Sequence, residues 1–196
     1  MATTPGNAAS ASQPGDSGVW FFILADMTGF AVFFLVFMLG RAADPTTYEA
    51  SRTALDLRFG LANTLILLTS GAFIAQATRE AQRHNWAKAR LYLILTLASG
   101  LPFAVSKILE WKGKVDHGIG LTTNEFFTYY FVFTGIHFLH FVVGVAVLIV
   151  LMATTARSDK SLAVRLRWIE AGGAYWHMVD LLWIVLFAML YLMRAA

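Results

Sequence analysis

Most residues of this chain that could take part in chemistry lie inside long apolar runs. His177 and Asp180 stand three residues apart in the last run, so they share one face of a helix. His137, His140 and Gly144 form a similar stripe in the preceding run, and the glycine would let a neighbouring helix come close. Histidines and a carboxylate can bind a transition metal, and facing histidines can ligate a haem. We favour a third prediction, an interhelical hydrogen-bond cluster of the three histidines and Asp180 without a metal.

Two more acids lie in or beside apolar runs. Asp26 comes about two turns into the first run, where an ionisable side chain is costly unless it faces protein or water. Two interpretations stay open: a hydrated carboxylate near the interface, bonded to Thr28 or to a neighbouring helix, and a functional intramembrane acid. Glu110 ends the third run, where it could pair with Lys107 or with another chain. Lys107 itself could extend its ammonium group to the interface.

Several kinds of chemistry are excluded by what the sequence lacks. It contains no cysteine, which rules out disulfides, thiolate metal sites and cysteine nucleophiles. It has no glycine-rich phosphate loop, no Ser-His-Asp arrangement and no pair of facing carboxylates. The net charge of +3 suits a protein that faces anionic lipid, and nothing in the sequence indicates binding to nucleic acid. The residues alone therefore indicate no catalytic centre in this chain.

The elements that must position these residues are membrane-spanning helices. The chain has 196 residues, of which 58% are hydrophobic and 14% charged, whereas soluble domains have about 25% charged residues. Five apolar runs predict helices over about 19–39, 59–77, 91–109, 126–152 and 172–193. At about 1.5 Å per residue each can cross the hydrocarbon core of a bilayer. The loops are short, so we predict an all-α multipass bundle of five transmembrane helices, one domain over residues 18–196.

The two ends of the chain are predicted to lie on opposite sides of the membrane. Residues 1–17 are rich in Ala, Ser, Thr, Pro and Gly and are predicted to be a disordered tail. A cleaved signal peptide would need basic residues at its start, but no Lys or Arg precedes Arg41. The second and fourth loops hold slightly more basic residues than the opposite side, which favours a cytoplasmic N-terminus and a periplasmic C-terminus.

Five segments together resemble one known family. Residues 175–183, Tyr-Trp-His-Met-Val-Asp-Leu-Leu-Trp, strongly resemble the signature of subunit III of haem-copper oxidases, the cytochrome c oxidase subunit III family. Four more segments agree with that family in the right order: the acid-bearing helix at 20–34, Leu-Ala-Asn-Thr-Leu with a later Ser at 61–70, Gly-Leu-Pro-Phe to Glu-Trp at 100–111, and Thr-Gly-Ile-His with a second His at 134–140. The resemblance extends from about Gly18 to the C-terminus.

The resemblance implies a function that the residues alone do not. By this resemblance, the chain looks like the five-helix form that is typical of bacterial quinol oxidases and of the NorE-like branch associated with nitric oxide reductases. The acids Asp16 and Asp26 near the start of the chain favour the NorE-like branch. The implied protein is a non-catalytic accessory subunit in the bacterial inner membrane that binds no haem or copper itself. Its implied partners are phospholipids and a catalytic subunit I-like chain, which would hold haem with copper or non-haem iron. The implied role is to support proton uptake and stable turnover.

The sequence departs from the family at a few positions and leaves other functions open. Asp26 stands where the family usually has Glu, Phe138 where it has Gly, and Lys107 where Gln is common. The shorter acid leaves open whether Asp26 has a role in proton uptake or in a lipid cleft. The alternatives to an accessory subunit are a free-standing assembly or activation factor for such a complex and a small proton-coupled transporter that uses Asp26 and Asp180.

Overall fold

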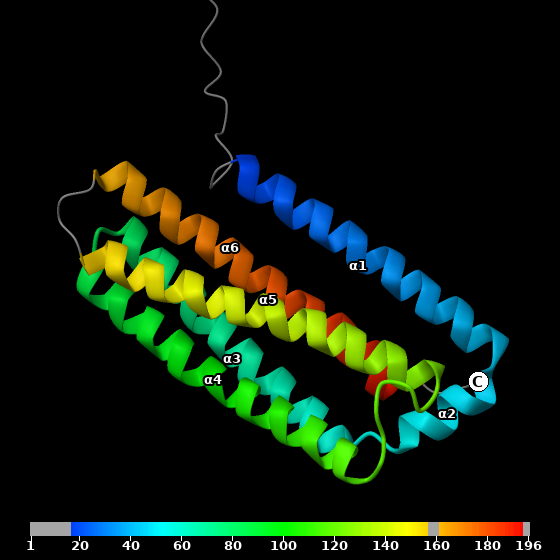
Figure 1. Cartoon of the computed structure of the whole chain (residues 1–196). Coiled ribbons are helices and arrows are strands. Elements are labelled where there is room, and N and C mark those ends of the chain that lie inside the picture. Colours follow the sequence, from blue (N-terminus) through cyan, green and yellow to red (C-terminus); the bar gives the residue numbers. More distant parts are fainter. Residues whose placement is uncertain (1–16, 157–160, 194–196) are drawn as a thin grey trace, which may run out of the picture.

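The computed structural model describes residues 17–156 and 161–193, and within these ranges the chain folds as helices (Figure 1). The bounds are α1 Ser17–Ala43, α2 Pro45–Thr53, α3 Leu57–Gln82, α4 Trp86–Asp116, α5 Glu125–Ala156, α6 Leu162–Phe187 and the π-helix η1 Ala188–Leu192. The predicted disordered tail over 1–17 lies, except for Ser17, outside the described residues.

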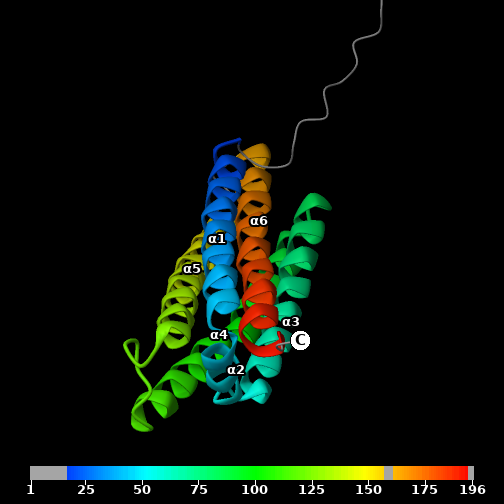
Figure 2. The ribbon, with the colours of Figure 1, turned by 90° about the vertical axis from the view of Figure 1, so that its right-hand side faces the viewer.

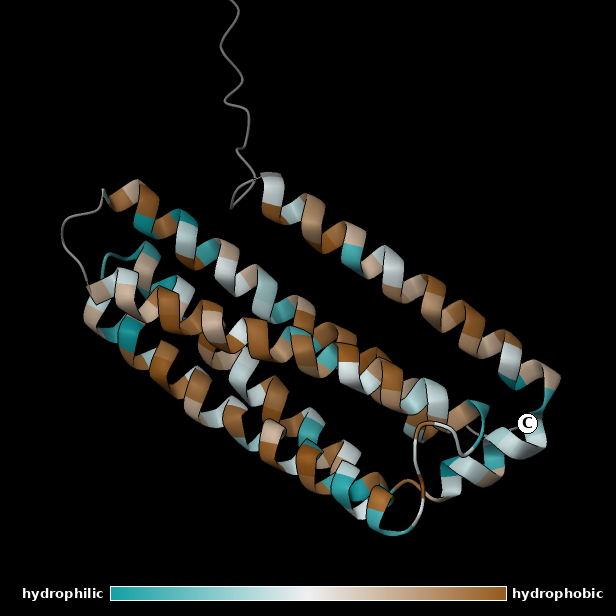
Figure 3. Cartoon of the chain, in the orientation of Figure 1, coloured by the Kyte–Doolittle hydropathy of each residue, from teal (hydrophilic) through white to brown (hydrophobic). Residues whose placement is uncertain are grey.

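Five of these helices are long and apolar enough to cross a membrane, namely α1, α3, α4, α5, and α6 continued by η1. The predicted fold class, an all-α multipass bundle of five transmembrane helices, is therefore confirmed. Apolar residues dominate α1 and α5 along most of their length, and hydrophilic residues gather towards the helix ends (Figure 3). Large side chains such as Phe21, Val105 and Leu139 are more than half exposed, which suits a surface covered by lipid.

The last helix is longer than its apolar run. It begins at Leu162 rather than near residue 172, because charged residues at the interface continue the helix and no proline stops it. Apolarity marks only the part of a helix that meets the hydrocarbon. The apolar run therefore predicted the span correctly, but it placed the start of the helix too late.

The segment between the first two predicted helices, which we expected to be a loop, contains α2. Pro45 opens this helix, and the Asp44 carboxylate caps it by accepting a hydrogen bond from the backbone N–H of Thr47 at 3.1 Å. Hydrogen bonds from Thr47, and then from Thr46, hold the pKa of the Asp44 carboxyl below its usual value. An Asp followed by Pro is a typical start of a helix, so the sequence contained the signal for this short helix.

The helices differ in how deeply they are packed. α3 and α4 form an extensive antiparallel pair, and α6 packs against both α3 and α5. Figures 1 and 2 show α1 beside α5 and α6 and away from the α3–α4 pair. In the most apolar window of α6, 67% of the residues are buried, whereas in that of α1 only 17% are. α6 is therefore the central helix of the bundle and α1 the peripheral one.

The core forms around two tryptophans of α6. Trp176 and Trp183 are almost completely buried, with Phe141 packed on the first and Phe103 on the second. Gly144 of α5 makes room for Trp176, because a Cβ atom at this position would lie 3.0 Å from the indole ring. The predicted close approach at Gly144 thus occurs, and its neighbour is Trp176.

Candidate functional site

The structure does not bring His137, His140, His177 and Asp180 together, so the predicted single cluster is wrong. His140 faces α1, His137 lies in the core, and the pair on α6 faces α3. Residues three apart on a helix differ by about 60° in direction around its axis. On α5 this difference sends one histidine to α1 and the other between Phe103 and Trp183. Spacing along one helix could not fix which neighbour each residue meets.

Asp26 and His140 join α1 to α5. Oδ1 of Asp26 lies 3.1 Å from Nε2 of His140, and both side chains are largely buried. The other ring nitrogen, Nδ1, lies 2.8 Å from the backbone oxygen of Ile136. Thr28 is not the partner of Asp26, because its hydroxyl donates to the backbone oxygen of Leu24. Of the interpretations open for Asp26, the structure therefore shows a polar contact with a neighbouring helix, α5.

The hydrogens in this contact depend on the tautomer of the His140 ring. A carbonyl oxygen can only accept, so Nδ1 of His140 must carry a hydrogen to bond Ile136. A hydrogen bond between Nε2 and Asp26 then needs one more proton, either on the ring or on the carboxyl group. In both forms the pair has no net charge, which suits the low dielectric of a membrane span. Without this proton the neutral ring could donate to only one of its two acceptors, Ile136 or Asp26, and the pair would carry a negative charge.

His137 is fully buried in an aromatic setting. Its ring centroid lies 5.6 Å from that of Phe103 and 5.4 Å from that of Trp183. Neither ring nitrogen has a hydrogen-bond partner among the residues that the structure describes. His137 therefore packs as an aromatic ring in the core.

His177 and Asp180 form a loose pair on α6. Nδ1 of His177 lies 3.8 Å from Oδ2 of Asp180, which is too long for a hydrogen bond. Within the described part of the chain, neither oxygen of Asp180 has a hydrogen-bond partner, although only 5% of this residue is exposed. Gly71 of α3 accommodates the carboxylate, since any Cβ there would overlap Oδ2. The His177 side chain is half exposed.

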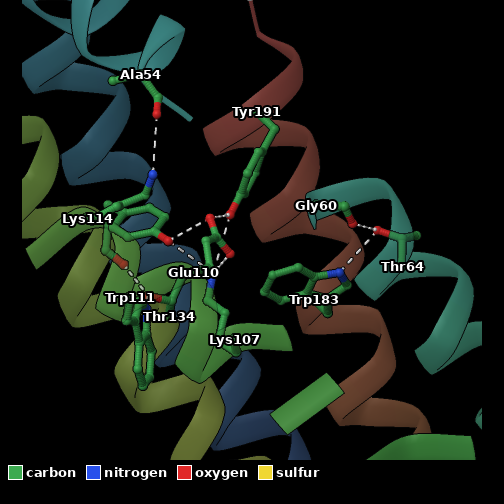
Figure 4. A network of polar contacts seen from close by, with 11 residues as sticks. Ala54, Gly60, Thr64, Lys107, Glu110, Trp111, Lys114, Thr134, Trp183 and Tyr191 are labelled. Carbon is green, nitrogen blue, oxygen red and sulfur yellow. Dashed lines mark hydrogen bonds and ion pairs between the residues drawn. The ribbon is translucent and has the colours of Figure 1, made fainter. Parts of the chain in front are cut away.

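Glu110 lies at the centre of a buried polar network near the other end of the bundle (Figure 4). Its carboxylate accepts hydrogen bonds from Nζ of Lys107 at 2.9 Å, from the Tyr130 hydroxyl at 2.8 Å and from the Tyr191 hydroxyl at 2.6 Å. The predicted pairing of Glu110 with Lys107 is confirmed. The prediction that Lys107 extends to the interface is wrong, because its exposed fraction is 0%.

The Lys107 ammonium stays buried because the interior of the bundle provides an anion and aromatic rings around it. Besides Glu110, it lies 4.9 Å from the centroid of the Tyr130 ring and 5.0 Å from that of Trp183. Sequence reasoning missed both tyrosines of this network. Tyr191 lies in η1, and an apolar run carries no signal for a π-helix, a form that often occurs at functional sites.

A groove of about 540 Å³ runs between α1, α3 and α6. Its α1 wall is apolar, and one end carries Arg79, Gln82 and Glu170, where Nε2 of Gln82 donates to Oε1 of Glu170 at 3.0 Å. Asp26 is not among the residues that line this groove. A second hollow of about 350 Å³ shares Ala75, His177 and Leu181 with it and reaches Gly71 and Asp180. The two hollows form one groove along α3 and α6.

The dispersed acids and histidines form no evident metal centre. Among the described residues, no three or more His, Cys, Asp or Glu side chains lie together in a way that could hold a metal ion. What these residues can do is share a proton, as in the Asp26–His140 pair, or bind a neighbouring molecule.

Comparisons with known proteins identify the family. A model of the family described as cytochrome c oxidase subunit III matches residues 2–195. The cytochrome c oxidase subunit 3 of Alkalihalophilus pseudofirmus is 32% identical over 90% of this chain and 85% of its own length. The cytochrome bo(3) ubiquinol oxidase subunit 3 of Buchnera aphidicola is 25% identical over 89% of this chain and 92% of its own length.

A third relative, the heme-copper oxidase subunit I+III of Aeropyrum pernix, is 28% identical over 90% of this chain and 22% of its own length. Every span of this chain lies within the part that the family model covers. The chain therefore belongs to the cytochrome c oxidase subunit III family, whose members are non-catalytic accessory subunits of haem-copper oxidases.

Proposed function

We propose that this chain packs beside the catalytic subunit of a bacterial haem-copper oxidase and keeps a protonated site ready at the edge of that enzyme. The Asp26–His140 contact carries the proposal, because it needs one shared proton inside a membrane span. The relative named subunit I+III supports the choice of partner, since both subunits share one chain there. Haem and copper would belong to the catalytic subunit.

The position of the pair suits a proton reservoir. α1 is the least buried span, so Asp26 lies close to the surface of the bundle while its bond to His140 keeps it off bulk water. The second carboxylate oxygen, Oδ2, is also buried and has no partner in the described part of the chain, so a proton reaches it only when α1 moves to admit water or a lipid head group. A cytoplasmic N-terminus would put the pair nearer the side from which an oxidase takes up protons, and we adopt that orientation.

A phospholipid is the second partner that we propose. The groove between α1, α3 and α6 has apolar walls, and Arg79 lies at the end that meets the interface. Such a groove suits an acyl chain, with the phosphate at the guanidinium group. Asp26 does not line the groove, so the lipid and the proton site are separate in this proposal.

The alternatives lead to different observations. A stable subunit remains stoichiometric with the catalytic chain after detergent washing, whereas an assembly factor is lost. A proton-coupled transporter would carry protons into vesicles that contain this chain alone. The relatives compared above are oxidase subunits, which supports an oxidase partner. The NorE-like relationship and a nitric oxide reductase partner stay predictions, and genes for a catalytic subunit beside this one would decide between them.

The test is the Asp26→Asn variant in fully assembled complexes. Asn keeps the size of the side chain and can still hydrogen-bond, but it cannot exchange the shared proton. We expect normal assembly with slower turnover or a shorter active lifetime in progress curves at several pH values. Asp26→Glu, which restores an acid, should recover most of the loss. Superimposable curves for Asp26→Asn and the unmodified chain would overturn the proton role and leave the accessory role intact.

A further inference from the structure

Part of the α3–α6 groove lies deep in the membrane. Gly71 is eleven residues from the end of α3 at Gln82, which places it roughly 16 Å along the helix from the interface end. The hydrocarbon core is about 30 Å thick, so this point is near its middle. Here the groove is floored by small residues, Gly71, Ala72 and Ala75, and opposite them stand His177 and Asp180. We call these five residues the α3–α6 face.

Asp180 is the unusual member of this face. Only 5% of it is exposed, and neither of its oxygens has a hydrogen-bond partner in the described part of the chain. Burying a polar group without a partner costs several kcal/mol, and buried polar groups in native proteins are nearly always satisfied. His177 adds a half-exposed imidazole at the same depth. The half-exposed imidazole therefore faces the groove, and the buried carboxylate lines it, where the surrounding solvent is hydrocarbon.

The chemistry of Asp180 decides between the possible occupants of the groove. A lipid acyl chain could fill the space but has no hydrogen-bond donor. A transmembrane helix with a donor side chain could satisfy the carboxylate and cover the imidazole. The exposed Ala72 is small enough to let another helix approach closely, and exposed apolar residues on both sides, Leu68 and Ile184, would pack against its flanks.

The hollow between α3 and α4 lacks this combination. A larger hollow of about 800 Å³ lies between α3 and α4 near Pro102 and Val105. None of the residues that line it has a buried side-chain atom without a hydrogen-bond partner. Lipid alone can cover that surface. The unsatisfied carboxylate therefore singles out the α3–α6 face.

We propose that the α3–α6 face binds a transmembrane helix of the catalytic subunit, which places a hydrogen-bond donor against Asp180. The identity of the partner rests on the proposed function. The need for a donor rests only on the geometry of Asp180, Gly71 and His177. The helix enters at the deep part of the groove, and the interfacial part beside Arg79 stays available to lipid.

The absence of native cysteine allows a direct test by crosslinking in membranes that contain the whole complex. A benzophenone maleimide is attached to Ala72→Cys on the α3–α6 face or, as the matched control, to Val105→Cys on α4. Both positions are exposed in the isolated chain. We expect light to join Ala72→Cys to the catalytic subunit with at least fivefold higher yield than Val105→Cys. Equal yields, a higher yield from Val105→Cys, or adducts of Ala72→Cys with only lipid or a second copy of this chain would overturn the proposal.

A second variant tests the donor. Asp180→Leu should lower the amount of chain retained per catalytic subunit after detergent washing at least fivefold, while Asp180→Asn, which can still accept a hydrogen bond, should lower it less. Unchanged retention of Asp180→Leu would overturn the role of the carboxylate. If the unmodified chain co-purifies with the oxidase and only the crosslinking result is negative, the binding face is wrong and the accessory function stands. If the unmodified chain never co-purifies, both fail.

Discussion

Glu110 and Asp180 are equally buried, each with 5% of its surface exposed, but their surroundings differ completely. Glu110 accepts hydrogen bonds from Lys107 and two tyrosines, whereas Asp180 accepts none among the described residues. The chain itself supplies the hydrogen-bond donors that Glu110 needs. Glu110 therefore holds α4, α5 and η1 together. Asp180 lacks a donor, so it is suited to another molecule. Satisfaction of hydrogen bonds, rather than burial, distinguishes a structural acid from a binding acid in this membrane protein.

The largest effect should follow from Glu110→Ala. It leaves the buried Lys107 ammonium without its anion, and breaking one side of a buried ion pair costs ~3–5 kcal/mol. Unfolding of the isolated chain by SDS in mixed micelles would measure the loss. The control is Arg83→Ala, because Arg83 is 75% exposed and its pair with Glu80 should contribute less than ~1 kcal/mol. A similar small loss for both variants would contradict a structural role of Glu110.

Lys107→Met should cost less than Glu110→Ala, about 1–3 kcal/mol. Tyr130 and Tyr191 still donate to Glu110 in this variant, and the carboxyl group can take up a proton. The same SDS titration compares the two. A larger loss for Lys107→Met would show that the ammonium, and not the carboxylate, organises the network.

Gly71→Ala should destabilise the chain by ~1–3 kcal/mol, because the added methyl group overlaps the Asp180 carboxylate. The double variant with Asp180→Ala should recover most of this loss, since the overlap is then gone. Purely additive losses would mean that Gly71 is required by something other than Asp180.

The smallest loss should come from Asp180→Ala in the isolated chain, which should lose no stability, because no hydrogen bond is lost and a buried carboxylate without a partner is removed. The SDS titration of the chain alone measures it. A loss as large as that of Glu110→Ala would remove the distinction between the two acids.

The sequence predicted the fold class well and the side-chain contacts poorly. Five runs of apolar residues were enough for five spans, because length and apolarity alone decide what can cross a membrane. Contacts depend on how each helix is rotated about its axis, and in a chain this apolar the polar residues are too few to fix that rotation. Asp26 was therefore identified as an intramembrane acid without its partner His140.

The network around Glu110 shows the same division. The Lys107 pairing followed from local spacing on one helix, whereas Tyr130 and Tyr191 reach Glu110 from α5 and from η1. Asp180 was also placed correctly within a span, but the expectation of a partner on α5 failed because its side of α6 faces Gly71 on α3. Long-range contacts between helices are what the sequence left undetermined.

The bond between Asp26 and His140 also sets an order for biosynthesis. Asp26 leaves the ribosome first, and His140 follows about a hundred residues later, which takes roughly 10 s at ordinary rates of translation. Until then α1 lies in the bilayer with its acid uncovered, and the acid must stay protonated or close to the head groups. α6, the other spanning helix that packs against α1, is made later still. α1 is therefore made well before the two spanning helices that it packs against.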